Sequence, residues 1–304
     1  MAAPFADRLA AAVQSKRSSL VVGLDPRLES LPLAVRRAAQ EAAGAAAPAR
    51  EVAAEAIRRF DEAVIRLVAP CAVAVKPQIA FYERYGPPGL SAYEHAVMAA
   101  RAAGLLVIGD IKRGDIGTTA EAYAEAHLTG EAAADAVTLN PYLGSDSVAP
   151  FLQTAARVGG GAFVLVRTSN PSARELQDLP VRGRPLHEHV AELVNAWGTE
   201  SRGECGYSSV GAVVGATAPA ELERLRRLMP HAWLLVPGVG AQGATAADVA
   251  AAFDRNGLGA LVNSSRGILY AFRDPAADDW QSPIRDAARQ LRDQLRDAAL
   301  QAAS

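Results

Sequence analysis

The chain has 304 residues, of which 50% are hydrophobic and 21% are charged, and its formal net charge is -2. This composition is typical of a soluble globular protein, with neither a basic patch for nucleic acid nor an apolar run near the roughly 20 residues of a membrane span. Two cysteines, Cys71 and Cys205, are too few for a disulfide scaffold. From these observations together we expect a cytoplasmic protein that binds neither nucleic acid nor a membrane.

The N-terminal segment, Met1 to Lys16, is Ala-rich and amphipathic, and it contains Asp7 and Arg8, unlike a secretory signal. Beyond it, short aliphatic runs alternate with longer segments of helical period, as in repeated βα units. The runs lack strict alternation, which suits a parallel sheet buried on both faces. Eight units in this length predict an α/β fold, a (β/α)8 TIM barrel, as a single domain over residues 1–304. The predicted strands are Leu20 to Leu24, Ala72 to Lys76, Leu105 to Asp110, Ala136 to Asn140, Ala162 to Arg167, Val210 to Gly215, Trp233 to Pro237 and Gly259 to Asn263, and the predicted helices include Glu94 to Ala103, Thr118 to Ala126 and Pro219 to Leu228.

Three segments are longer than such a barrel requires. The Ala-rich stretch from Leu31 to Arg59 predicts an extra helix or a covering loop near the first βα unit. The segment from Arg182 to Ser208 is similarly long, and Ile284 to Ala303 predicts an amphipathic final helix. We expect the last two to serve packing.

The most informative stretch is Gly109 to Asp115, where charged residues directly follow the apolar run Leu105 to Ile108. In a strand, positions i and i+2 face the same side, so Asp110 and Lys112 share one side while Arg113 points to the other. The sequence therefore predicts a carboxylate and an ammonium in one pocket. The alternative is a solvated loop with a structural ion pair.

The histidines His187 and His189 lie close together, and on a strand, with Glu188 between them, they would imitate a metal site. The preceding Gly183 to Pro185 and the following Val190 to Val194 predict the start of a helix instead. On a helix the two imidazoles diverge, so we predict no metal site here.

A glycine-rich segment, Gly238 to Gly243, follows the seventh predicted strand and matches the Gly-x-Gly-x-x-Gly dinucleotide fingerprint. That fingerprint also needs an acidic residue about 20 positions further on, and no Asp or Glu lies between Asp254 and Asp274. Barrels commonly hold phosphate on the loops after strands seven and eight. Because Ser264 to Gly267, with Arg266, follows the eighth strand, we favour a phosphate site. The alternative is two tight turns and a surface arginine.

Polar residues stand where many of the predicted strands end, whereas the opposite face of the barrel, around the points where the strands begin, shows mostly Ser, Ala and Gly. Barrel enzymes build their sites at the carboxyl ends of the strands. This asymmetry favours a functional site at that end. The residues concerned are Asp25, Lys76, Asp110, Lys112, Asn140, Thr168, Ser169, Gln242 and Arg266.

These motifs resemble those of the orotidine 5'-phosphate decarboxylases, which convert orotidine monophosphate (OMP) to uridine monophosphate (UMP) and CO₂ in pyrimidine synthesis. The resemblance spans most of the chain, and two further segments are similar to the longer, second bacterial branch of the family, type 2. The shared motifs are Val22 to Pro26, the Asp-x-Lys-x-x-Asp of residues 110–115, Pro237 to Gly243 and Arg266, and the two further segments are Ala74 to Gln78 and Arg167 to Pro171.

The resemblance implies a charged array of Lys76, Asp110 and Lys112 in one active site. It also implies a homodimer, in which Asp115 reaches across the interface into the neighbouring subunit's site. The substrate-binding residues implied in the same way are Asp25 for the ribose, Thr119 for the ribose across the interface, Ser169 for the pyrimidine edge, Gln242 and Arg266 for the phosphate, and Asn140 and Pro237 as further contacts.

The implied reaction leaves a carbanion at C6 of the pyrimidine, with its lone pair outside the π system. Since no imine or thiazolium sink is available, the protein must stabilise this carbanion electrostatically. Lys112 is a cation that also delivers a proton to C6, which makes it the predicted general acid. Its flanking carboxylates keep it protonated, and we expect neither a metal nor a cofactor.

Two other functions remain open at this point. A sibling barrel with the same Asp-x-Lys-x-x-Asp pattern acts on a sugar phosphate, as a decarboxylase or aldolase, through an enediolate stabilised by Mg²⁺. That chemistry requires an acidic metal ligand near the second strand, where this chain has Lys76, followed by Pro77 and Gln78. A lysine at this place would repel Mg²⁺. A non-catalytic nucleotide-binding barrel has no need for alternating lysines and carboxylates in its pocket.

Overall fold

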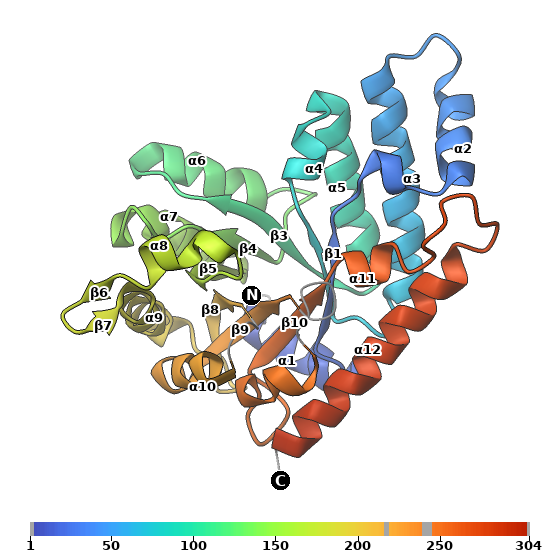
Figure 1. The fold of residues 1–304 in the computed structure, drawn as a ribbon. Coiled ribbons are helices and arrows are strands. Elements are labelled where there is room, and N and C mark those ends of the chain that lie inside the picture. The colour runs from blue at the N-terminus through green and yellow to red at the C-terminus, as the bar shows by residue number, and fades with distance from the viewer. Residues whose placement is uncertain (1–2, 216–218, 239–244, 303–304) are drawn as a thin grey trace.

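Eight parallel strands form a closed barrel in the computed structural model, which describes residues 3–215, 219–238 and 245–302 (Figure 1). Around the barrel the order is β1-β10-β9-β8-β5-β4-β3-β2, and a separate two-stranded hairpin, β6-β7, lies outside it. The predicted barrel is confirmed, and each predicted strand overlaps an observed one. The barrel strands are β1 (Leu20–Leu24), β2 (Ala74–Pro77), β3 (Leu106–Arg113), β4 (Ala136–Leu139), β5 (Gly161–Arg167), β8 (Ser208–Val214), β9 (Ala232–Pro237) and β10 (Ala260–Ser264), and the hairpin is β6 (Pro180–Val181) and β7 (Arg184–Pro185).

Helices surround the barrel, in keeping with the alternation of apolar and helical segments in the sequence (Figure 1). Between β9 and β10 the described connection is a 3₁₀ helix, η4 (Ala247–Ala252), rather than an α-helix. Within the described ranges, none of the helices is both long and apolar enough to cross a bilayer. The α-helices are α1 (Phe5–Lys16), α2 (Leu33–Ala43), α3 (Ala49–Val68), α4 (Ala80–Glu83), α5 (Gly86–Ala102), α6 (Gly117–Leu128), α7 (Ser145–Val158), α8 (Arg174–Gln177), α9 (Leu186–Trp197), α10 (Pro219–Leu228), α11 (Arg266–Leu269) and α12 (Gln281–Ala302).

Helix α1 packs at the end of the barrel where the strands begin. The ring of Phe5 meets the ring of Phe163 edge-on at 6.0 Å between centroids, and the backbone N–H of Ala6 donates to the hydroxyl of Ser209. Residues of α1 form one apolar cluster with inward-facing residues of the strands, among them Trp233 and Leu261. The interior of the barrel is therefore filled by side chains at this end, and the charged residues singled out in the sequence stand toward the opposite end, where the strands finish.

The Ala-rich stretch predicted to add a helix or a loop contains α2 and the first half of α3. Helix α2 packs along α3 outside the barrel, and the long C-terminal helix α12 also contacts α3 (Figure 1). The segment from Arg182 to Ser208 contains the barrel helix α9, which follows the β6-β7 hairpin.

A buried carboxyl group, Asp61 on α3, lies between helix and barrel with no exposed surface. The hydroxyl of Tyr82 donates to its Oδ2 at 2.7 Å, and its Oδ1 has no hydrogen-bond partner among the described residues. Burial raises the pKa of Asp61 to about 7; the hydrogen bond from Tyr82 opposes this shift, and the charge of Asp25 adds to it. Folding therefore favours the protonated form of this group.

We expect Asp61→Asn to change how stability depends on pH. In the unfolded chain Asp61 titrates near 3.8, so folding takes up a proton between this value and about 7. The parent therefore loses up to about 1.4 kcal/mol of unfolding free energy per pH unit as pH rises through this window, and nothing further above it. Asparagine still accepts from Tyr82 and does not ionise. The free energy of unfolding of the variant therefore rises relative to that of the parent between about pH 5 and about pH 8. Urea unfolding of both proteins at these two pH values measures the change. If the difference in unfolding free energy between variant and parent is the same at both, the expectation is contradicted.

Candidate active site

Two adjoining cavities open at the carboxyl ends of the strands. The first, called here the apolar cavity, has a volume of about 220 Å³, and the second, the polar cavity, has about 200 Å³. Both are lined by Lys76, Asp110 and Pro237, so they form one continuous site. The apolar cavity is also lined by Lys112, Thr138, Leu165, Thr168, Ser169, Asn170, Val213 and Leu235, and the polar cavity by Asp25, Gln78, Gly238, Asn263, Ser264, Ser265 and Arg266.

Three charged side chains meet at the junction of the cavities. The ammonium of Lys76, from β2, pairs with Oδ2 of Asp110, and the ammonium of Lys112 pairs with Oδ1 of the same carboxylate. Lys76 and Asp110 are buried, whereas the Lys112 side chain is 45% exposed and therefore accessible to a ligand. The prediction that Asp110 and Lys112 share one pocket is confirmed.

The paired lysines keep Asp110 ionised although it is buried. Burial alone favours the neutral carboxyl, but the charges of Lys76 and Lys112 outweigh it and hold the pKa of Asp110 well below its usual range. Burial likewise favours neutral Lys76, but the carboxylates of Asp110 and Asp25 outweigh it and raise the pKa of Lys76 above its ordinary value. Asp110 therefore stays ionised in the interior beside the charged ammonium of Lys76.

The backbone at Lys112 is unusual for a lysine. Its φ is +47°, in the left-handed region, which costs an L residue about 1–2 kcal/mol. The pairing register of β3 with β4 shifts between Gly109 and Arg113, on either side of this residue. Arg113, the next residue, does not line the cavity, and its guanidinium pairs with Glu83. Backbone strain of this kind persists where the surrounding structure holds it, and it clusters at functional sites.

The loop after β5 forms one wall of the apolar cavity through Thr168 and Ser169. Gln177 holds this loop, because its Oε1 accepts from the backbone N–H of Thr168 at 2.9 Å and its Nε2 donates to the Thr168 hydroxyl at 2.8 Å. Leu165, Val213 and Leu235 add an aliphatic wall, so the cavity suits a flat, mainly apolar ring with polar groups at its edge.

The polar cavity offers groups of a different kind. Arg266, the first residue of α11, supplies a guanidinium, and Ser264 and Ser265 lie beside it. Oδ1 of Asp25 and Oδ1 of Asn263 are buried and lack hydrogen-bond partners among the described residues. A ligand with hydroxyl groups near these oxygens and an anionic group near the guanidinium satisfies both requirements.

Three of the predicted site residues, Asp115, Thr119 and Asn140, do not line either cavity. Gln242 lies outside the described residues. Asp115 is half-buried and its Oδ1 accepts from the backbone N–H of Ile116; Thr119 is exposed on α6. Asn140 is exposed, and its Oδ1 accepts from the backbone N–H of Tyr142 rather than facing a cavity. The roles predicted for these residues stay predictions.

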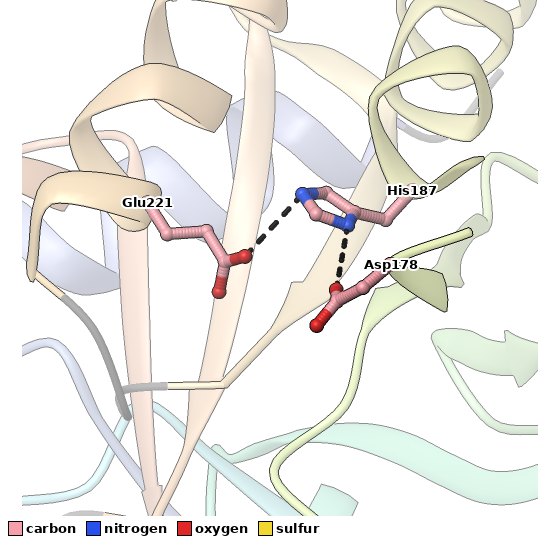
Figure 2. Close-up of side chains that lie close together, drawn as sticks. All are labelled: Asp178, His187 and Glu221. Carbon is pink, nitrogen blue, oxygen red and sulfur yellow. Dashed lines mark ion pairs between the residues drawn. The ribbon is translucent and has the colours of Figure 1, made fainter. Parts of the chain in front are cut away.

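The histidine pair lies on a helix as predicted, since α9 begins at Leu186. His187 is drawn into a cluster that the sequence did not reveal, in which its Nδ1 lies 3.4 Å from Oδ1 of Asp178 and its Nε2 lies 3.3 Å from Oε1 of Glu221 (Figure 2). Arg167, at the end of β5, also pairs with both carboxylates. A metal ion would have to displace this guanidinium, so we assign the cluster to tying the loop after β5 to α9 and α10.

Comparison with known proteins agrees with this arrangement. The model of the orotidine 5'-phosphate decarboxylase / HUMPS family matches residues 18–278. Orotidine 5'-phosphate decarboxylase from Rhodopirellula baltica is 46% identical over 305 residues, which cover 96% of this chain and 99% of that protein, and the one from Deinococcus radiodurans is 44% identical over 300 residues, with 98% and 99% covered. A crystal structure of a putative orotidine-monophosphate decarboxylase from Toxoplasma gondii superposes with a TM-score of 0.82 at 34% identity, covering 99% of this chain and 98% of its own, and one from Streptomyces avermitilis with a TM-score of 0.79 at 36%, covering 98% and 96%. The chain therefore belongs to the orotidine 5'-phosphate decarboxylase / HUMPS family.

Proposed function

We propose that this protein decarboxylates OMP to UMP and CO₂ in pyrimidine biosynthesis, as a cytoplasmic enzyme of the second bacterial branch, type 2, folded as a single barrel domain. The observation that supports the reaction is the carboxylate of Asp110 held between Lys76 and Lys112 at the junction of the two cavities. Relatives with the name of this enzyme match nearly the full chain. The branch assignment rests on the motifs around Lys76 and Thr168.

Each of the two cavities accommodates a different part of the substrate. The pyrimidine lies in the apolar cavity, with its amide edge at Ser169, whose hydroxyl both donates and accepts. The phosphate lies in the polar cavity at Arg266, and Asp25, between them, accepts from the ribose hydroxyls. This placement brings C6 of the pyrimidine to the junction, where Lys112 stands.

The proposed chemistry needs a cation and a proton at C6. As the bond from C6 to the carboxylate carbon breaks, CO₂ leaves and the electron pair stays on C6. The Lys112 ammonium stabilises that pair and then donates its proton to it, which gives UMP. Asp110 holds Lys112 in place through its Oδ1, and Lys76 pairs with Oδ2 of the same carboxylate.

The first experiment follows the ultraviolet change of OMP mixed with the purified protein in buffer that contains a chelator. Conversion to UMP under these conditions is the expected result. Conversion of a sugar phosphate upon addition of Mg²⁺, with none of OMP, would instead assign the protein to the sibling enzymes of its family. The buried ammonium of Lys76 opposes that outcome because it repels a divalent cation at the junction.

A homodimer with shared sites is a further part of the proposal. Asp115 and Thr119 line neither cavity of their own chain, and large apolar side chains are exposed nearby, Ile116 at 57% and Tyr142 at 73%. The loops after β3 and β4 lie together, since the N–H of Asn140 donates to the carbonyl of Arg113 at 2.9 Å. A second copy covering this surface would bury the apolar side chains and bring Asp115 to the partner's site.

We expect Arg266→Ala to lower kcat/KM for OMP by about 100-fold to 1,000-fold, because a charge-assisted pair with the phosphate is lost and remote binding energy no longer assists the reaction at C6. Steady-state kinetics measure the loss. Arg273→Ala is the matched control, since this exposed arginine lies outside both cavities. A loss below about 5-fold at Arg266 would show that it is peripheral to the phosphate.

A further inference from the structure

Thr138 is a buried residue of β4 whose place in an apolar run gives no sign of a role in the site. It is 1% exposed and lines the apolar cavity. It belongs to the strand next to β3, so its side chain lies under the segment from Asp110 to Lys112.

The hydroxyl of Thr138 joins the two central charged residues. The backbone N–H of Lys112 donates to Thr138 Oγ1 at 3.0 Å, and Thr138 Oγ1 donates to Oδ1 of Asp110 at 2.9 Å. Oδ1 of Asp110 is also the atom that pairs with the Lys112 ammonium. The Thr138 hydroxyl therefore accepts from the backbone of Lys112 and donates to Asp110, the ion-pair partner of the Lys112 side chain.

This contact replaces a strand-to-strand hydrogen bond that the backbone does not make. The register of β3 with β4 shifts around Lys112, whose left-handed φ of +47° takes its N–H out of the regular ladder. An N–H that leaves the ladder in a partly buried place needs another acceptor, and the Thr138 hydroxyl supplies it. Among side chains of similar size, serine also accepts and donates in this way, whereas valine does neither.

We propose that Thr138 is a positioning residue of the active site: its hydroxyl fixes Lys112 in the left-handed conformation and orients the Asp110 carboxylate, so that the ammonium is held where C6 of the substrate lies. This inference rests on the proposed role of Lys112. Thr138 acts through these two residues and takes no part in the proton transfer itself.

The test compares Thr138→Val with Thr138→Ser. We expect Thr138→Val to lower kcat by about 100-fold, since small displacements of a catalytic group have effects of this size, with KM for OMP and the dissociation constant of UMP within about 3-fold of the parent. Thr138→Ser restores the hydroxyl, so its kcat is expected within about 5-fold of the parent. Thr154→Val, at a buried threonine of α7 outside both cavities, is the matched control and leaves kcat unchanged.

The split between kcat and KM separates positioning from a purely structural role. A structural role predicts a lower thermal midpoint and less active protein, with unchanged kcat per folded site titrated with UMP. If Thr138→Val does not fold, Thr138→Ala, which also lacks the hydroxyl, takes its place in the comparison with serine.

Two results would overturn the inference: a kcat for the valine variant within about 3-fold of the parent, or an equal loss in the serine and valine variants. Lys112→Ala, measured in parallel, keeps the two proposals distinct. If Lys112→Ala retains turnover, the proposed role of Lys112 fails. If Lys112→Ala is inactive while Thr138→Val is fully active, only the role of Thr138 fails.

Discussion

Lys112→Ala is expected to lower kcat for OMP by on the order of 10⁴-fold or more, because it removes both the cation that stabilises the C6 carbanion and the proton that quenches it. The loss is measured from the ultraviolet change as OMP is converted to UMP. Thermal protection by UMP is expected to persist, since the groups proposed to hold the ribose and phosphate are intact. Turnover in the alanine variant within about 10-fold of the parent would exclude Lys112 as the general acid.

Two controls define what the lysine contributes. Lys112→Arg keeps a positive charge but cannot give up a proton near neutral pH, so it too is expected to be nearly inactive. Lysine occurs in the chain only at positions 16, 76 and 112. Lys16 lies outside both cavities, and its ammonium donates to the carbonyls of Ala69 and Ala72 at 3.0 and 2.9 Å. Lys16→Ala is therefore expected to lower the thermal midpoint and to leave kcat unchanged.

Asp115→Ala is also expected to be nearly inactive, and mixing it with Lys112→Ala is expected to restore activity. In a mixed dimer with shared sites, one site combines the intact Lys112 of one subunit with the intact Asp115 of the other. After the subunits exchange in an equimolar mixture, about a quarter of the parent activity is expected, because half of the dimers are mixed and each has one intact site.

The control for this experiment is a mixture of Lys112→Ala with Asp110→Ala, whose defects lie in the same chain's site. Since Asp110 pairs with Lys112 within one chain, no mixed dimer of these two variants contains an intact site. Recovery in the control, or none in the Asp115 mixture although sedimentation shows that dimers have exchanged, would contradict a site shared through Asp115.

The barrel was predictable from the sequence because its strands are buried on both faces and so appear as uninterrupted aliphatic runs. Boundaries were less certain, as at β3, which continues to Arg113 rather than ending at Asp110. The charged residues after Ile108 resemble a loop in composition, yet Thr138 and Glu83 provide partners that let the strand continue. Such partners come from distant parts of the chain, so local composition does not reveal them.

The charged centre of the site was predictable for a similar reason. Asp25, Lys76 and Asp110 follow or end predicted strands, and the carboxyl ends of parallel strands meet at one end of a barrel. Thr138 and Asn263 were missed: Thr138 is a single polar residue within an apolar run, and Asn263 ends the eighth predicted strand directly before the polar residues Ser264 and Ser265. The polar groups that they satisfy, or leave open, become visible only when the strands are placed side by side.

The left-handed backbone at Lys112 sets two demands on the same position against each other. Glycine adopts this conformation without strain, so stability of the barrel alone favours glycine there, whereas the proposed reaction requires an amine. Laboratory evolution toward thermal stability alone is therefore expected to erode this position early, and a stabilised descendant of the enzyme has to be screened for turnover as well as for heat resistance.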